Sequence, residues 1–220
     1  MVNRRHFIRA CALIGAVGCW QGPLAWAQVA AGGKPVILVV GDSLSAEYGL
    51  KRGEGWVPLL EKRLAEQKIA ATVINASISG DTTAGGRARL AGLLSQHRPT
   101  HVVIELGGND ALRGLPLAGT EDNLMQMTKS AQAAGAQVLI VGIQVPPNYG
   151  ADYTRRFEAI FAKVADSTRA ALVPFLLKGV VDSPEAATLF QADRIHPTAA
   201  AQARMLDNVW PALRKLLSTR

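Results

Sequence analysis

The chain alternates short apolar runs with longer segments in which apolar residues recur every three or four positions. Five of the runs predict β-strands: Val36–Val40, Thr72–Asn75, His101–Leu106, Val138–Ile143 and Leu172–Phe175. The runs are rich in Val, Ile and Leu and lack polar alternation, which is typical of strands buried on both faces of a sheet. We therefore expect a mainly parallel, five-stranded sheet that is covered by helices on both sides.

The intervening segments predict amphipathic helices. The clearest apolar stripe comprises Phe157, Ile160, Phe161, Val164 and Ala165. The segment 124–134 ends at Gly135, a residue that suits a helix C-terminus. The last helix is expected to begin at Pro197 and to be kinked or split by Pro211. Together these segments predict an α/β fold with three layers, α/β/α.

Polar motifs follow the predicted strands, at the edge where open parallel sheets bind their ligands. The motifs are Gly41-Asp42-Ser43, Asn75 to Asp81, Gly107-Gly108-Asn109-Asp110 and, before the last helix, Asp193-Arg194-Ile195-His196. Each alone is unspecific, because Gly-Asp-Ser also suits a turn, Gly-Gly-Asn-Asp a flexible loop and Asp-x-x-His a surface pair. Their joint occurrence predicts an active site at this edge.

These residue types match the parts of a serine hydrolase. Ser43 is the candidate nucleophile, since a hydroxyl needs a nearby base to attack at neutral pH. His196 is the candidate base, and Asp193 would orient the imidazole and stabilise its protonated form. Ser45, Ser77 and Ser79 compete as nucleophiles. Ser43 is preferred because it follows a strand end directly, with a glycine two positions before it.

A developing oxyanion needs preorganised hydrogen-bond donors. The candidates are the backbone N–H groups of Ser43 and Gly80 and the side-chain amide of Asn109. Gly80 has no side chain to obstruct an acyl group, and Asn109 donates without adding a charge. We expect no metal and no cofactor, because no metal-ligand spacing and no Gly-x-Gly-x-x-Gly or Walker pattern occurs.

Residues 1–27 are expected to be a signal peptide rather than part of the fold. They combine a basic start, a short uncharged run and a small-x-small cleavage signature at Ala25-Trp26-Ala27. The Arg4-Arg5 region resembles a twin-arginine signal, with an ordinary Sec signal and lipidation at Cys19 as alternatives. The segment is too short to span a membrane, so we expect a periplasmic or secreted protein.

Residues 28–220 are expected to form one domain. Both cysteines lie in the leader, so this domain would have neither disulfides nor thiolate chemistry. Removing three arginines and no acid lowers the formal net charge from +7 to +4, which is ordinary surface charge. We therefore expect no nucleic-acid partner and no transmembrane segment, and a monomer that acts on a small-molecule substrate.

The four motifs resemble those of the SGNH, or GDSL, hydrolases, and they occur here complete and in order. The stretches Asn75–Thr82, Glu105–Gly114 and Pro147–Gly150 are most similar to the subgroup of bacterial periplasmic thioesterases, lysophospholipases and arylesterases. The resemblance implies a flavodoxin-like sheet, broad specificity for carboxylic esters and thioesters, and an acyl-binding groove. The groove residues that it implies are Gly108, Leu112, Leu115, Val145 and Pro146.

Two other functions stay open at this point. A carbohydrate acetylesterase of the same fold would use the same catalytic residues, although the apolar residues near Asn109 favour acyl chains over sugars. A secreted binding module that kept the fold without catalysis would not need all four motifs.

Overall fold

Five parallel strands form the centre of the computed structural model, which describes residues 33–219. The strands are β1 (Val36–Gly41), β2 (Thr72–Asn75), β3 (His101–Glu105), β4 (Gln137–Val141) and β5 (Ala171–Val173), in the order β2-β1-β3-β4-β5. All four pairings are parallel, which confirms the predicted sheet. The predicted signal peptide, residues 1–27, lies outside the described residues and stays a prediction.

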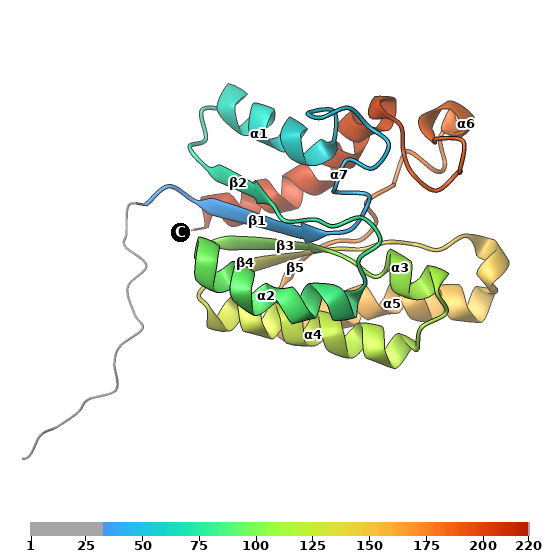
Figure 1. The fold of residues 1–220 in the computed structure, drawn as a ribbon, viewed down its shortest axis with the longest axis horizontal. Coiled ribbons are helices and arrows are strands. Elements are labelled where there is room, and N and C mark those ends of the chain that lie inside the picture. Colours follow the sequence, from blue (N-terminus) through green and yellow to red (C-terminus); the bar gives the residue numbers. More distant parts are fainter. Residues whose placement is uncertain (1–32, 220) are drawn as a thin grey trace, which may run out of the picture. The chain divides into compact units, whose positions relative to one another are not determined.

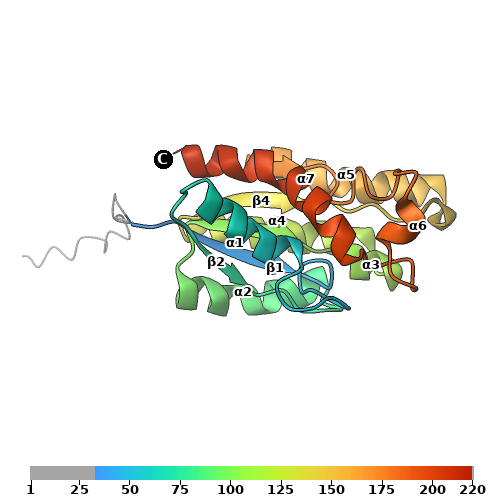
Figure 2. The ribbon, with the colours of Figure 1, turned by 90° about the horizontal axis from the view of Figure 1, so that it is seen from above.

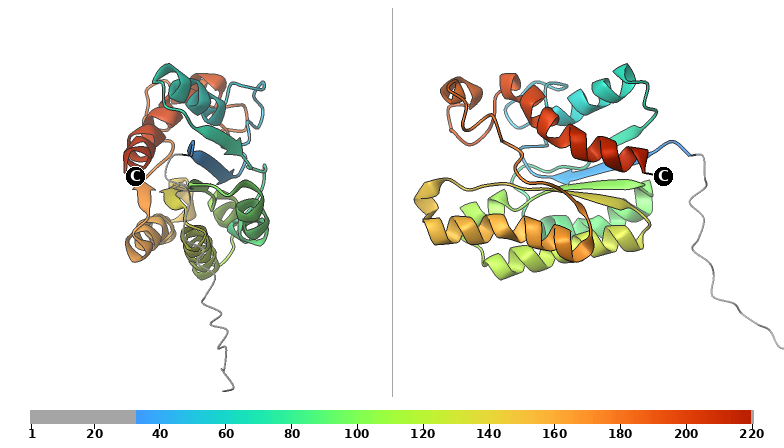
Figure 3. Two further views of the ribbon diagram at one scale, coloured as in Figure 1. Left: turned by 90° about the vertical axis from the view of Figure 1, so that its left-hand side faces the viewer. Right: turned by 180° about the vertical axis from the view of Figure 1, so that it is seen from behind.

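Helices cover both faces of the sheet, so the three predicted layers are confirmed (Figures 1 and 3). One face carries α1 (Trp56–Glu66) and α7 (Ala199–Ser218), which pack side by side in Figure 2. The other face carries α2 (Thr83–His97), α4 (Leu117–Ala133) and α5 (Ala151–Thr168). Three short segments follow strands at their carboxyl ends: α3 (Gly108–Leu112), η1 (Pro147–Tyr149) and α6 (Ala186–Leu189).

The last helix differs from its prediction in two respects. It begins at Ala199 with Thr198 as its N-cap, so Pro197 precedes the helix. It also continues through Pro211 and is not split there. Buried apolar residues lie on both sides of this proline, among them Val209 and Leu213, and their packing offsets the lost backbone hydrogen bond.

The core lies on both faces of the sheet and is mainly apolar. Ile37 to Val40 and Val102 to Ile104 are fully buried, as expected for central strands covered by helices. Trp56, at the start of α1, and Phe157 and Phe161, from α5, are the largest fully buried side chains. None of the helices within residues 33–219 is long and apolar enough to cross a membrane.

Candidate active site

Ser43, His196 and Asp193 form a continuous hydrogen-bonded chain, although Ser43 is separated from His196 by 153 positions. The His196 Nε2 atom lies 2.9 Å from the Ser43 Oγ atom, and Nδ1 lies 2.7 Å from Asp193 Oδ2. The Gly-Asp-Ser turn after β1 presents the serine, and the segment before α7 presents the other two. The structure thus brings the three predicted residues together in the order that a serine hydrolase requires.

The Asp193–His196 segment is a small turn that holds its own side chains. The backbone N–H groups of Ile195 and His196 donate to Asp193 Oδ1 at 2.9 and 3.0 Å, and Arg194 between them has a φ of 57°. These bonds and the one from the imidazole lower the pKa of Asp193 to about 2. Asp193 therefore stays ionised at neutral pH, and its stabilising contribution is lost only as the pH falls from about 3.8 towards 2.

Tyr48 is a site residue that the sequence did not single out. Its ring lies against the imidazole of His196, with a centroid separation of 4.3 Å and an interplanar angle of 40°. The contact limits the ring orientations that His196 can adopt. Tyr48 is 143 positions from Gln191, whose amide donates to the Tyr48 carbonyl at 2.9 Å. Only the folded chain brings these segments together, so local sequence patterns do not reveal the contact.

The competing serines are placed differently from Ser43. Ser45 is 1% exposed, and its hydroxyl lies between Trp56 and Glu105, with bonds of 3.2 and 2.7 Å. Ser79 is exposed, and the two ring nitrogens of His196 bind Asp193 and Ser43 rather than Ser77 or Ser79. The geometry therefore favours Ser43 as the activated hydroxyl.

Two of the three predicted oxyanion donors are free. Within residues 33–219 neither the Ser43 N–H nor the Gly80 N–H has a hydrogen-bond partner. Gly80 has a φ of 79°, which a side chain would strain. The Arg113 guanidinium donates to the Gly80 carbonyl at 2.7 Å and so holds the loop that carries this N–H.

The third donor, Asn109, lies in the first turn of α3 and is already engaged. Its amide nitrogen donates to Asp42 Oδ2 and to the Asp81 carbonyl, both at 3.0 Å. An amide nitrogen has two hydrogens. A substrate oxyanion must therefore share or replace one of these bonds when it binds to Asn109.

Asp42 and Asp110, the acidic residues of two motifs, bind neighbouring segments of the site and hold them in place. Burial raises the pKa of Asp42 to about 6, against the hydrogen bond from the Leu44 N–H, the charge of His196 and the hydrogen bond from Asn109. Asp110 accepts bonds from the backbone N–H and the hydroxyl of Thr83, at the start of α2. Asp110 thus fixes α2 against α3, a structural role that the motif alone does not reveal.

The predicted groove residues are found in different surroundings. Gly108 is half-buried, and a Cβ atom there would lie 3.6 Å from Asp42 Oδ2. Leu112 and Leu115 are exposed after β3, at 44% and 37%. Val145 is buried in the core at 7%, and Pro146 is exposed beyond β4. Their contact with substrate stays a prediction.

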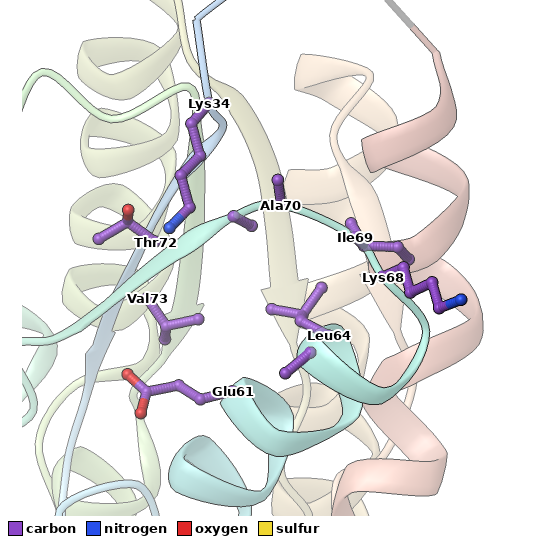
Figure 4. A pocket seen from close by; sticks show the side chains of 10 residues that line it. Lys34, Glu61, Leu64, Lys68, Ile69, Ala70, Thr72 and Val73 are labelled. Carbon is purple, nitrogen blue, oxygen red and sulfur yellow. The ribbon is translucent and has the colours of Figure 1, made fainter.

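A pocket of about 500 Å³ lies at the opposite end of the sheet (Figure 4). It is lined by residues at the end of α1 and at the starts of β1 and β2, including Glu61, Lys68 and Thr72. The triad lies at the carboxyl ends of the strands, so this pocket is separate from it. Within residues 33–219 no three His, Cys, Asp or Glu side chains are grouped to hold a metal ion.

We expect Asp193→Asn to lower kcat by about 10²-fold. The change removes the charge that stabilises the imidazolium, and the new amide favours the wrong tautomer of His196. Where the aspartate of such a triad is buried, this change lowers kcat by roughly 10⁴-fold. The Asp193 side chain is 37% exposed, so water already weakens the interaction between its charge and the imidazolium. The expected loss of kcat is therefore smaller. Steady-state kinetics on one ester tests this. Activity within about twofold of the wild type would contradict the role.

Comparisons with known proteins agree with this geometry. Residues 39–204 match the GDSL-like Lipase/Acylhydrolase family. The chain is 52% identical to Esterase TesA of Pseudomonas aeruginosa, over 91% of this chain and 96% of that protein. It is 40% identical to Thioesterase 1/protease 1/lysophospholipase L1 of Escherichia coli K12, over 83% of this chain and 85% of that protein.

A solved structure also matches this chain over most of its length. The psychrotrophic esterase EstA from Pseudoalteromonas sp., inhibited by monoethylphosphonate, superimposes with a TM-score of 0.79 at 40% identity. The match covers 84% of this chain and all of that one. The residues that match the family include both Ser43 and His196. This protein therefore belongs to the GDSL-like lipase/acylhydrolase family.

Proposed function

We propose that this protein is a serine esterase that hydrolyses carboxylic esters and thioesters through an acyl-enzyme intermediate. The observation that carries the proposal is the hydrogen-bonded chain from Ser43 through His196 to Asp193, next to two unoccupied N–H donors. As a member of its family, the protein is a hydrolase of ester bonds. The catalytic roles of the individual residues are our assignment.

In the first half-reaction, Ser43 Oγ attacks the acyl carbonyl carbon while His196 Nε2 takes the hydroxyl proton. The carbonyl oxygen becomes an oxyanion, which the N–H groups of Ser43 and Gly80 and the Asn109 amide stabilise. The carbon–oxygen or carbon–sulfur bond then breaks, and His196 returns its proton to the leaving alcohol or thiol. The acyl group stays on Ser43.

The second half-reaction repeats the first with water as the nucleophile. His196 takes a proton from water, whose oxygen attacks the acyl-enzyme carbonyl. The carboxylic acid leaves, and Ser43 Oγ regains its proton. Ionised Asp193 stabilises the imidazolium in both halves, and its pKa of about 2 keeps it charged throughout.

Apolar side chains around the triad favour acyl chains as substrates. The large apolar residues exposed at this edge include Tyr48, Ile78, Leu112, Leu115, Tyr149 and Ile195. Burying the surface of such residues against a hydrocarbon chain is favourable by about 25 cal/mol per Å². The alternative is a carbohydrate acetylesterase, which would bind its sugar through the exposed polar residues at this edge, such as Ser79 and Arg113.

Purified residues 28–220 should hydrolyse medium-chain acyl esters and acyl thioesters in a panel that also contains lysophospholipids and acetylated sugars. Ser43→Ala provides the blank for each substrate. Hydrolysis of the acetylated sugars alone would favour the acetylesterase. Folded wild-type protein that is no more active than Ser43→Ala on any substrate would favour a binding module.

We further propose that the protein is exported, on the basis of the leader features at residues 1–27. Acyl-CoA is then a rare substrate, and esters of lipids or foreign compounds are the natural ones. Cell fractionation with N-terminal sequencing tests this. Mature protein that begins at Gln28 outside the cytoplasm is the expected result, and full-length protein in the cytoplasm would contradict it.

A further inference from the structure

Glu105, the last residue of β3, is a buried acid that the proposed reaction does not use. It is 0% exposed, and none of the ion pairs found within residues 33–219 includes it. In the same range its Oε1 atom has no hydrogen-bond partner. An ionised carboxylate without a cation is far more costly to bury than a neutral carboxylic acid.

The contacts of Glu105 all lead to the turn that carries the nucleophile. Its Oε2 atom accepts the Ser45 hydroxyl at 2.7 Å, and a Cβ atom placed on Gly41, the residue before Asp42, would lie 3.0 Å from the same oxygen. The Ser45 hydroxyl in turn accepts the Trp56 indole N–H at 3.2 Å. Glu105 therefore binds Ser45, after the nucleophile, and packs against Gly41, before it.

The charges around Glu105 do not favour its ionisation. The adjacent acid is Asp42, which follows Gly41, the register partner of Glu105 on β1. On α2, the Arg89 guanidinium donates to the Gly41 carbonyl at 3.5 Å, but it pairs with Asp81 at 2.9 Å. His196, from the segment before α7, interacts electrostatically with Asp42 and lowers the pKa of Asp42 rather than that of Glu105. Burial and the charge of Asp42 raise the pKa of Glu105 well above its ordinary value, against the hydrogen bond from Ser45.

We propose that Glu105 is a neutral carboxylic acid at neutral pH and acts as a positioning residue for the nucleophile turn. This positioning role rests on Ser43 being the nucleophile. Glu105 packs against Gly41, and the next residue, Asp42, accepts the Asn109 amide at 3.0 Å, so the same carboxyl group supports both the serine turn and an oxyanion donor. Ionisation would place a second negative charge beside Asp42 and loosen the turn.

Infrared difference spectroscopy at neutral pH tests the protonation state without any assay of activity. The wild-type spectrum minus that of Glu105→Gln should contain the carbonyl stretch of a protonated carboxylic acid. The matched control Glu66→Gln, at an exposed position on α1, should give only carboxylate bands. Carboxylate bands alone for Glu105→Gln would overturn the proposal. This outcome is independent of whether Ser43 is the nucleophile.

The pH dependence of unfolding gives a second readout. A raised folded-state pKa means that the folded protein holds a proton that the unfolded chain releases above about pH 4.5, so stability falls as the pH rises. One such proton changes the unfolding equilibrium constant by about tenfold per pH unit. Asp42 contributes in the same direction only up to about pH 6. Above that pH, Glu105→Gln should be less pH-dependent than the wild type, and equal slopes would contradict the neutral acid.

Kinetics separates positioning from general support of the fold. Glu105→Ala should lower kcat by about 10- to 100-fold with a smaller change in KM, because small misplacements at the reacting centre are costly. Glu105→Gln, which keeps the shape and the neutral charge, should recover most of that loss. Ser45→Ala removes the Ser45–Glu105 hydrogen bond and should lower kcat by less than Glu105→Ala does. This variant replaces Glu105→Ala as the test if Glu105→Ala does not fold. Equal losses in the Gln and Ala variants would show that the negative charge is needed.

Discussion

His196→Ala should lower kcat by about 10⁴- to 10⁶-fold while the protein stays folded, because the serine loses the base that takes its proton. The imidazole lies 2.9 Å from Ser43 Oγ, whereas His97 and His101, the other histidines within residues 33–219, lie at the end of α2 and the start of β3, at the opposite end of the sheet. Burst kinetics with a chromogenic ester measures the acylation step directly. The acyl-enzyme should form too slowly for a burst to appear.

The base and the nucleophile should behave as one unit. Ser43→Ala combined with His196→Ala should be no less active than either single variant, since each change already removes the same step. His97→Ala is the matched control, because His97 ends α2 at the opposite end of the sheet. It should keep wild-type activity. A His196→Ala enzyme that retains more than about a tenth of its kcat would show that another group is the base.

Asn109→Ala should lower kcat by about 10²- to 10³-fold with little change in KM, as expected for a donor that acts on the transition state. The amide is bound to Asp42 and Asp81 in the free protein, so its role depends on exchanging one of these bonds for the oxyanion. The ratio of kcat to KM, measured on esters and thioesters in parallel, tests this for both classes.

A neighbouring amide outside the site provides the comparison. Asn123 lies on α4 and donates to the Thr83 hydroxyl at 3.1 Å, so Asn123→Ala removes an amide without touching Ser43. It should leave kcat close to that of the wild type. If Asn109→Ala changed kcat by less than about threefold, the resting bonds to Asp42 and Asp81 would be its whole function and the oxyanion would rely on two backbone donors.

The sequence predicted the sheet because its strands are short, nearly continuous apolar runs, which are typical of strands covered on both faces. Burial on both faces holds for the central strands, whereas the edge strand β2 has no buried residue. It also predicted Ser43 and His196 together, because strand ends in a parallel sheet converge at one edge. The start of α4 at Leu117 was missed, since Gly119 and the polar run 120–123 precede the apolar stripe of that helix.

The remaining part of the site depends on contacts between distant segments. Ser45 competes with Ser43 in the sequence, and only its burial between Trp56 and Glu105 removes it. Arg89 binds Asp81 and the Gly41 carbonyl across two loops, which no local pattern indicates. Such partners are selected by packing in three dimensions, so the sequence supplies the reacting groups but not the residues that hold them.

The central claim is that Ser43 is the activated nucleophile. Mass spectrometry of the folded protein after reaction with a fluorophosphonate tests it most directly, because the reagent forms a covalent bond with an activated serine. We predict a single adduct on Ser43 that is absent from Ser43→Ala and forms far more slowly in His196→Ala. An adduct on Ser45, Ser77 or Ser79, or no adduct on the folded wild-type protein, would contradict the account.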